Sequence, residues 1–266
     1  RLGSFEASYP EAVQRSRRVA DRMAKAAPST VPQTPLPNVT YAVGGVVNVI
    51  DNRIPQSPVQ GFTGRGEARA GGAERETAGS VVLETGDGRV ALHADAYTRD
   101  TDDLRIKGPN ISPRLQQADP ARAVTFGTLP NSAARAKGGA LGASMTWDRG
   151  YAGVSYAGTD TYYGTVAEPN VVIDMQSSRL DFAGELRDIG SFITGAKFKF
   201  GRTHYEHREV DLGIVGTTFR STGYDSRVEL THAKLGPLHG AIGAQFGDVD
   251  FSAQGAEAFA TQAAAA

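Results

Sequence analysis

Gly44-Gly45-Val46-Val47-Asn48-Val49-Ile50-Asp51 is the most concentrated β-branched run in the sequence, and Asn52-Arg53-Ile54-Pro55 follows it directly. Paired glycines and a proline bound this run, which predicts one short buried strand with a firm end. The residues before the run are polar or helix-forming. The residues after it, to about residue 255, repeat a pattern of amphipathic strands and tight turns. The run therefore divides two kinds of chain.

The composition favours a folded protein made of strands and turns. The chain has 266 residues with 40% hydrophobic content, and it contains 32 glycines and 9 tyrosines. The absence of cysteine excludes disulfides, thiolate metal sites and cysteine nucleophiles. The formal net charge of −1 gives no reason to expect nucleic acid as a partner. No apolar run reaches the roughly 20 residues that a membrane-spanning helix needs.

Residues 1–43 are predicted to form a short N-terminal arm and a linker. A helix can begin after Pro10, but its apolar stripe is thin. A solvated helical or disordered arm is therefore favoured over a membrane-surface or nucleic-acid role. Four prolines between residues 28 and 37 then predict an extended, Pro-rich linker.

From Gly61 onward apolar residues recur at every second position, which is the period of a β-strand. In the clearest segment, 90–99, one face is apolar and the other carries His93, Asp95 and Arg99. Short turns are predicted at Gly86-Asp87-Gly88, Asp148-Arg149-Gly150, Asp188-Ile189-Gly190 and Leu235-Gly236-Pro237, and long polar connections at 101–119, 159–176 and 203–213. This pattern predicts an all-β, antiparallel up-and-down sheet of about eight to ten strands.

Two architectures fit this periodicity. A soluble β-sandwich also alternates, with its apolar residues packed inward. The expected strands, however, run about 10 residues or more, which suits a tilted strand that crosses a bilayer. Aromatic residues also fall near expected strand ends, where a membrane barrel has its interfacial girdles: Tyr97, Trp147, Tyr151, Tyr162, Tyr163 and Phe251. The pattern therefore favours a transmembrane β-barrel.

In the opening run and the strands after it, the chain resembles the TonB-dependent outer-membrane receptors. In that family a globular plug ends in a motif like residues 44–51, and a large antiparallel barrel begins just downstream. The resemblance covers roughly residues 43–260. The stretches that look most like the zinc-uptake branch are Asp51-Asn52-Arg53-Ile54-Pro55, Leu129-Pro130-Asn131-Ser132, Asp160-Thr161-Tyr162-Tyr163-Gly164, Gly184-Glu185-Leu186-Arg187 and Gly216-Thr217-Thr218-Phe219.

The resemblance implies a domain organisation. Residues 1–43 are an arm and linker unlike the family, 44–56 the end of a plug domain, 57–260 a partial β-barrel and 261–266 a tail. The family barrel is of the roughly 22-stranded plugged class, so the chain is expected to be a fragment. The residues expected at the plug–barrel junction are Gly44, Gly45, Asn48, Asp51 and Pro55.

The resemblance also implies a function, which is uptake of a scarce nutrient across the outer membrane of a Gram-negative bacterium. The implied substrate is a metal ion such as zinc, or a metal chelate such as a siderophore complex. The implied partners are outer-membrane lipid and, for the intact receptor, a TonB-type energy-coupling protein, with no nucleic acid and no cofactor. The alternative is a small self-contained β-barrel or β-sandwich that acts as a structural or adhesion module.

His204, Glu206 and His207 are the candidate metal ligands, because imidazole and carboxylate groups both suit zinc. The turn spacing places them at the end of a long loop, where a solvated polar loop is the competing interpretation. His93 is expected beside Asp95 on the polar face. The sequence contains no phosphate-binding loop, no His-Glu-x-x-His pair and no Gly-x-Ser-x-Gly elbow. These observations predict a protein that is not an enzyme.

Overall fold

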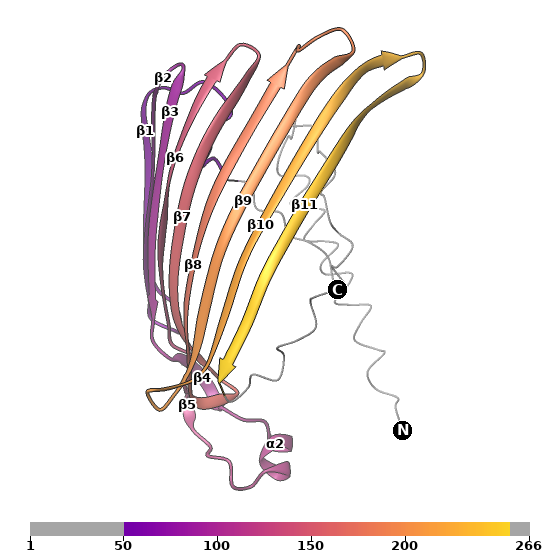
Figure 1. Ribbon diagram of the computed structural model, residues 1–266. Coiled ribbons are helices and arrows are strands. Elements are labelled where there is room, and N and C mark those ends of the chain that lie inside the picture. Colours follow the sequence, from indigo (N-terminus) through magenta and orange to yellow (C-terminus); the bar gives the residue numbers. More distant parts are fainter. Residues whose placement is uncertain (1–50, 256–266) are drawn as a thin grey trace, which may run out of the picture. The chain divides into compact units, whose positions relative to one another are not determined.

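The computed structural model describes residues 51–255, which form one curved β-sheet with a small appendage (Figure 1). The chain divides after Ile50 into two units, and residues 1–50 and 256–266 lie outside the described part. The predicted arm, the Pro-rich linker and the junction residues Gly44, Gly45 and Asn48 therefore also lie outside it.

Nine long strands form a single antiparallel sheet, in which consecutive long strands along the chain are also neighbours in space. The strand order is β1-β2-β3-β6-β7-β8-β9-β10-β11. The bounds are β1 (Gln60–Gly71), β2 (Glu76–Asp87), β3 (Val90–Thr101), β6 (Ala134–Trp147), β7 (Gly150–Thr165), β8 (Glu168–Arg187), β9 (Ile193–Asp211), β10 (Ile214–Leu235) and β11 (Leu238–Gly255). The predicted all-β, up-and-down antiparallel fold is confirmed.

The connection between β3 and β6 carries the remaining elements. Strand β4 (Leu104–Pro109) pairs with β5 (Phe126–Leu129), and helix α2 (Pro113–Ala118) lies between them in sequence. The helix begins at a proline, and the Ser112 hydroxyl caps it by accepting a hydrogen bond from the Leu115 amide at 3.2 Å. No helix in residues 51–255 has the length and apolarity to span a membrane. Figure 1 shows this appendage at the opposite end of the sheet from the β6–β7 and β10–β11 turns.

The four predicted short turns are found, between β2 and β3, β6 and β7, β8 and β9, and β10 and β11. Two of the three predicted long connections are wrong. Residues 159–176 are the paired ends of β7 and β8, joined at Val166 and Ala167, and residues 203–213 belong to the β9–β10 hairpin. Strand β8 consequently has 20 residues and β10 has 22. At about 3.3 Å per residue these strands are roughly twice as long as a bilayer core is thick.

The pairing register sorts the side chains into two faces, because directly paired residues on antiparallel strands point to the same side. We call the face that carries Leu180, Phe182 and Leu186 the outer face, and the opposite face the inner face. Each of the nine long strands places a large, exposed apolar residue on the outer face: Phe62, Leu83, Leu92, Leu141, Tyr156, Phe182, Phe198, Val228 and Ile242. The predicted alternation of apolar and charged faces is confirmed.

The outer face is apolar over only part of the strand length. Along β8 the apolar part runs from Leu186 to Leu180, and the next outward residues are Ser178, Gln176 and Asp174. From Leu186 to Leu180 the strand rises about 20 Å, close to the ~25 Å apolar band of outer-membrane barrels. Soluble proteins rarely expose so continuous an apolar surface. The outer face therefore has an apolar belt beside the short turns and a polar band toward the α2 end.

The predicted aromatic girdle is only partly found. The outer face carries Trp147 and Tyr162, whereas four of the six aromatic residues point to the inner face: Tyr97, Tyr151, Tyr163 and Phe251. Trp147 lies at the short-turn edge of the apolar belt, where an interfacial anchor is expected. Tyr162 lies in the polar band, beyond the belt. The prediction was wrong for the four residues on the inner face, because the sequence indicated where strands end but not which face each side chain takes.

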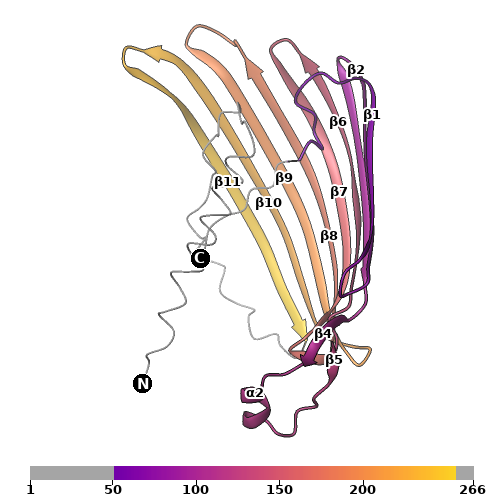
Figure 2. The same cartoon turned by 180° about the vertical axis from the view of Figure 1, so that it is seen from behind.

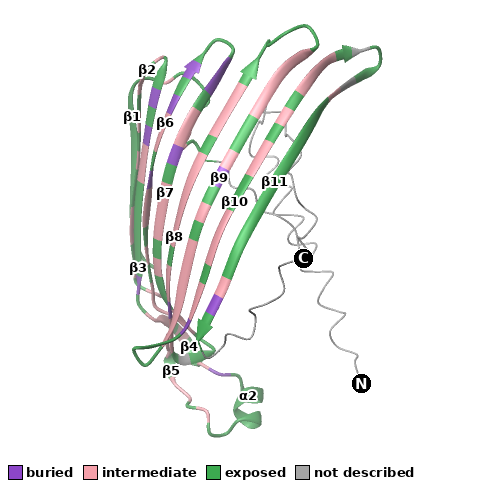
Figure 3. Cartoon of the chain, viewed as in Figure 1, coloured by how far each residue is buried: buried purple, intermediate pink, exposed green. Residues whose placement is uncertain are grey.

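The sheet is open within residues 51–255. Strand β1 pairs only with β2, and β11 pairs only with β10. Figure 3 shows β11 as mostly exposed, as expected for a strand with one neighbour. The described residues therefore form neither the small closed barrel nor the two-sheet sandwich considered as alternatives.

Replacing Phe246 with arginine should destabilise the sheet in a membrane by about 2–4 kcal/mol, because the charge enters the apolar belt. The matched change Gln245→Arg places the same charge on the inner face and should cost less than about 1 kcal/mol. The measurement is guanidinium unfolding of the chain folded in phospholipid vesicles, followed through Trp147, the single tryptophan. Equal losses in the two variants would contradict the assignment of the faces.

Candidate functional site

Residues 51–59, which precede β1, lie against the inner face and are called here the inner-face segment. Pro55 in this segment is fully buried. Figure 2 shows the segment in indigo, leading into β1. Asp51 and Pro55, which the sequence assigned to the junction, both belong to it. The sheet therefore carries a stretch of non-strand chain on its polar side.

Two inward-facing glycines leave room for the inner-face segment. A Cβ atom at Gly142 of β6 would overlap the carbonyl oxygen of Arg53. A Cβ atom at Gly153 of β7 would lie 2.5 Å from Cγ2 of Ile54, far inside van der Waals contact. Glycine at these two positions lets another stretch of backbone approach the sheet closely.

A charged pair fastens the segment to β3. The guanidinium of Arg53 donates through Nε to Oδ2 of Asp95 at 3.0 Å and through Nη2 to Oδ1 at 3.3 Å. The Asp95 side chain is only 15% exposed, so this bidentate pair is worth more than an ordinary surface ion pair. The hydrogen bond to Asp95 raises the pKa of Arg53, while burial opposes it. Asp51 supports the geometry by accepting the Arg53 backbone N–H at 3.2 Å.

His93 extends this network to β2. The ring is buried, with Nδ1 lying 3.0 Å from Oε1 of Glu84 and Nε2 lying 3.1 Å from Oδ2 of Asp95. The amide of Asn52 donates to the same Glu84 oxygen at 2.6 Å. The expectation that His93 lies beside Asp95 on the polar face is confirmed. We call these five residues (Asn52, Arg53, Glu84, His93 and Asp95) the junction network.

The structure separates the predicted metal ligands. His204, Glu206 and His207 lie within strand β9 and not in a loop, so the predicted loop position is wrong. The register puts His204 and Glu206 on the outer face and His207 on the inner face. No group of three or more side chains suited to a metal ion occurs within residues 51–255. The three residues are therefore not brought together.

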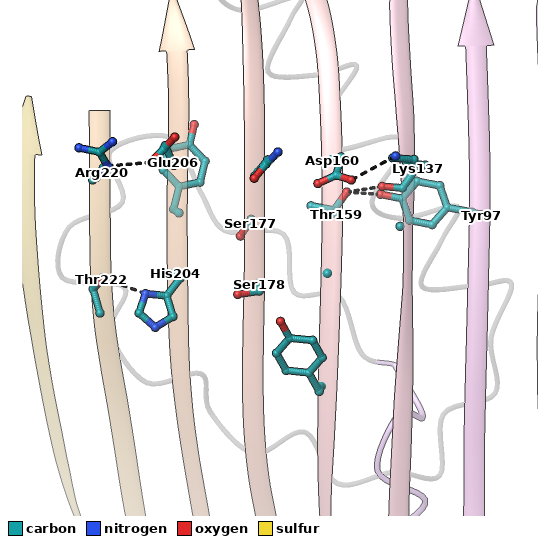
Figure 4. A pocket seen from close by; sticks show the side chains of 15 residues that line it. Tyr97, Lys137, Thr159, Asp160, Ser177, Ser178, His204, Glu206, Arg220 and Thr222 are labelled. Carbon is teal, nitrogen blue, oxygen red and sulfur yellow. Dashed lines mark hydrogen bonds and ion pairs between the residues drawn. The ribbon is translucent and has the colours of Figure 1, made fainter. Parts of the chain in front are cut away.

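Each of the three residues has a partner on its own face. Nδ1 of His204 lies 3.0 Å from Oγ1 of Thr222, and Glu206 accepts a hydrogen bond from Nε of Arg220 at 2.6 Å; Figure 4 shows both pairs on β9 and β10. On the inner face the His207 ring stacks on Phe219 at 4.5 Å and lies within hydrogen-bonding distance of a tyrosine hydroxyl.

A second inner-face cluster spans β8, β9 and β10. The guanidinium of Arg179 donates to both carboxylate oxygens of Asp181, at 2.8 and 3.0 Å, and to Thr203 at 3.0 Å. It also lies 3.4 Å from Asp225. Arg179 and Asp181 are two residues apart on β8 and therefore share a face, whereas their cross-strand partners follow only from the register of the sheet. Within residues 51–255 the inner face thus carries one charged cluster on β2 and β3 and another on β8 to β10. The two clusters flank β6 and β7, the strands whose glycines leave room for the inner-face segment.

The comparisons with known proteins give a fold and no family. No protein-family model and no curated protein matches the sequence. Among solved structures, the copper transporter OprC aligns with a TM-score of 0.56 at 9% identity, over 74% of this chain and 30% of the transporter. OmpT, an outer membrane protein of Vibrio cholerae, aligns with a TM-score of 0.33 at 12% identity, over 74% of this chain and 63% of OmpT.

At 9% identity the likeness to the copper transporter concerns the fold alone. That fold is the antiparallel sheet of an outer-membrane β-barrel, open within the described residues, as the apolar belt indicates independently. It agrees with the predicted location in the outer membrane of a Gram-negative bacterium. The chain spans about 30% of the length of the transporter.

Replacing Gly142 with alanine should release the inner-face segment, because the added methyl group overlaps the Arg53 carbonyl. The chain has no cysteine, so an Ile54→Cys variant provides a single thiol reporter. We expect thiol labelling at this position to become about tenfold faster in the Gly142→Ala background, as for a local loss of ~1.4 kcal/mol. Gly247→Ala is the control, since its Cβ would meet only ordinary contacts, the nearest at 3.6 Å. Unchanged labelling in both backgrounds would contradict the docked position.

Calorimetry with zinc, before and after the paired change His204→Ala plus His207→Ala, tests the predicted metal ligands. We expect equal heats, because the two imidazoles point to opposite faces of β9. A binding heat that the paired change abolishes would show that the two side chains do act together.

Proposed function

We propose that the chain forms part of an outer-membrane receptor that takes up a scarce nutrient, with energy supplied by a TonB-type coupling protein. In this function outer-membrane lipid contacts the apolar belt, and the inner face borders the transport path. The proposal rests on the inner-face segment held by the junction network, together with the sequence resemblance of residues 44–55. It includes no enzymatic activity, no cofactor and no nucleic-acid partner.

The inner-face segment is the observation that carries the proposal. An antiparallel sheet with a lipid-exposed outer face and a non-strand chain segment packed on its inner face is what a plugged barrel requires, whereas a simple pore needs only the sheet. The bidentate Arg53–Asp95 pair and the two accommodating glycines favour a chain segment that sits permanently against the strands. The residues immediately before the segment are those that resemble the end of a plug.

The proposed substrate class is a metal ion or a metal chelate. Zinc comes from the sequence resemblance, and one structural neighbour is a copper transporter, so both metals belong in the test together with an iron chelate. The described residues provide no cluster of metal-binding side chains. In this proposal the substrate is therefore recognised by other residues or as a chelate.

The alternative function, a structural or adhesion module built from a self-contained barrel or sandwich, is less well supported. It requires a closed or doubly packed sheet, and residues 51–255 form one open sheet with unpaired edges at β1 and β11. Such edges invite pairing with further strands.

Deleting the gene that encodes this chain should lower accumulation of one metal under limiting supply. Radiotracer zinc, copper and an iron–siderophore complex would be offered separately to parent, deletant and complemented cells, with and without a protonophore. We expect the deletant to accumulate less of one substrate only, and complementation to restore its accumulation. The protonophore should lower accumulation of that substrate in the parent to the level of the deletant. A deletant that accumulates all three substrates at the parental rate would contradict the proposal.

A further inference from the structure

The outer face carries an apolar groove of about 580 Å³ over β1, β2, β3, β6 and β7. Small residues form its floor, including Ala94 and Ala143, while large apolar side chains form its walls. The wall residues include Phe62, Leu83, Leu92, Leu141 and Tyr156. Leu141 is 69% exposed, so no other part of residues 51–255 fills this groove.

A second groove, of about 690 Å³, lies over β6 to β10 in the polar band, and Figure 4 shows its lining. Most of its lining residues belong to the outer face. Gly158 and Ser178 pair directly across β7 and β8, and their lack of large side chains leaves this part of the surface recessed. Ion pairs flank it on both sides, Lys137 with Asp160 at 3.5 Å and Arg220 with Glu206 at 2.6 Å.

The two grooves are consecutive along the same strands and share Tyr156. On β6 the polar groove is lined by Lys137, and the apolar groove begins at Leu141. On β7 the apolar groove begins at Val154, and the polar groove continues to Asp160. They therefore form one continuous, amphipathic depression that crosses the edge of the apolar belt.

We propose that this depression binds an outer-leaflet lipid that has a saccharide headgroup. The acyl chain lies in the apolar groove, and the headgroup lies in the polar groove toward the α2 end. Short turns mark the periplasmic end of an outer-membrane barrel, so the α2 end faces outward and the depression crosses the outer-leaflet boundary.

The lining explains why the headgroup is a saccharide. Each ion pair offers donors from its cation and acceptors from its carboxylate, and Gln176, Ser178 and Thr222 add an amide and two hydroxyls. Lipopolysaccharide carries anionic groups as well as sugar hydroxyls, and the cations Lys137 and Arg220 suit the first while the carboxylates, the amide and the hydroxyls suit the second. Tyr156 offers an aromatic ring where headgroup and acyl chain meet, a position that tyrosine favours at membrane interfaces.

This inference rests on the outer-membrane location in the proposed function, but it does not rest on transport. A deletant with normal metal uptake would end the transport proposal and leave lipid binding intact. Failure of lipid binding would likewise leave metal uptake to stand on its own test.

The experiment titrates the purified full chain, folded in detergent, with short-core bacterial lipopolysaccharide and counts bound lipid by native mass spectrometry. Ser178→Phe fills the polar groove and Ala143→Phe fills the apolar groove. Ser226→Phe places the same ring on the outer face, outside both grooves, and serves as the control. Far-ultraviolet circular dichroism verifies folding, and either groove variant can carry the test if the other misfolds.

We expect one lipopolysaccharide per chain, with affinity about tenfold lower in each groove variant and unchanged in Ser226→Phe. The deacylated saccharide and phosphatidylethanolamine should each bind more weakly than the intact glycolipid. Wild-type affinity in the folded groove variants would overturn the site. Equal competition by phosphatidylethanolamine would also overturn it, because the belt would then hold only non-specific boundary lipid.

Discussion

The antiparallel register is the constraint on which the rest of this structure depends. In hydrocarbon every backbone N–H and C=O needs a partner, and the ladder from β1 to β11 supplies partners throughout its interior. The same ladder decides which face each side chain takes. A slip of one residue in β10 would turn Arg227 and Glu229 toward lipid and Val228 toward the inside. Alternation in sequence and pairing in space therefore enforce each other.

The inner face shows how such a sheet can hold a second stretch of chain. Gly142 and Gly153 remove side chains where the inner-face segment crosses, and the backbone of Arg53 and the side chain of Ile54 take the space. The Arg53–Asp95 pair then sets the position of the segment along the strands. The glycines leave room for the segment, and the ion pair fixes where it lies. Neither feature would be sufficient without the other, since glycine alone offers room but no direction.

The sequence predicted the sheet well where one face is apolar, as at residues 90–99. It failed at 159–176 and 203–213, where β7, β8, β9 and β10 extend beyond the apolar belt. There the outer face becomes polar while the inner face carries apolar residues such as Ile173 and Met175, so the alternation no longer marks one apolar face and the residues look like loops. The candidate metal ligands on β9 were misplaced for this reason. The contact between His93 and Asp95 was predictable because the two residues are two apart on one strand. The Asn52–Glu84 bond joins residues 32 apart and needed the fold.

The number of strands in the open sheet has a topological consequence. Each antiparallel neighbour reverses direction, so β1 and β11, the first and last of nine, run the same way. These two edges can meet each other only as a parallel pair, whereas every other pair in the sheet is antiparallel. Closure by the rule that the sheet already follows needs an odd number of added strands, which makes the total even. The strands that would close this sheet are therefore specified in number and direction. They are odd in number, and the first and last of them both run opposite to β1 and β11.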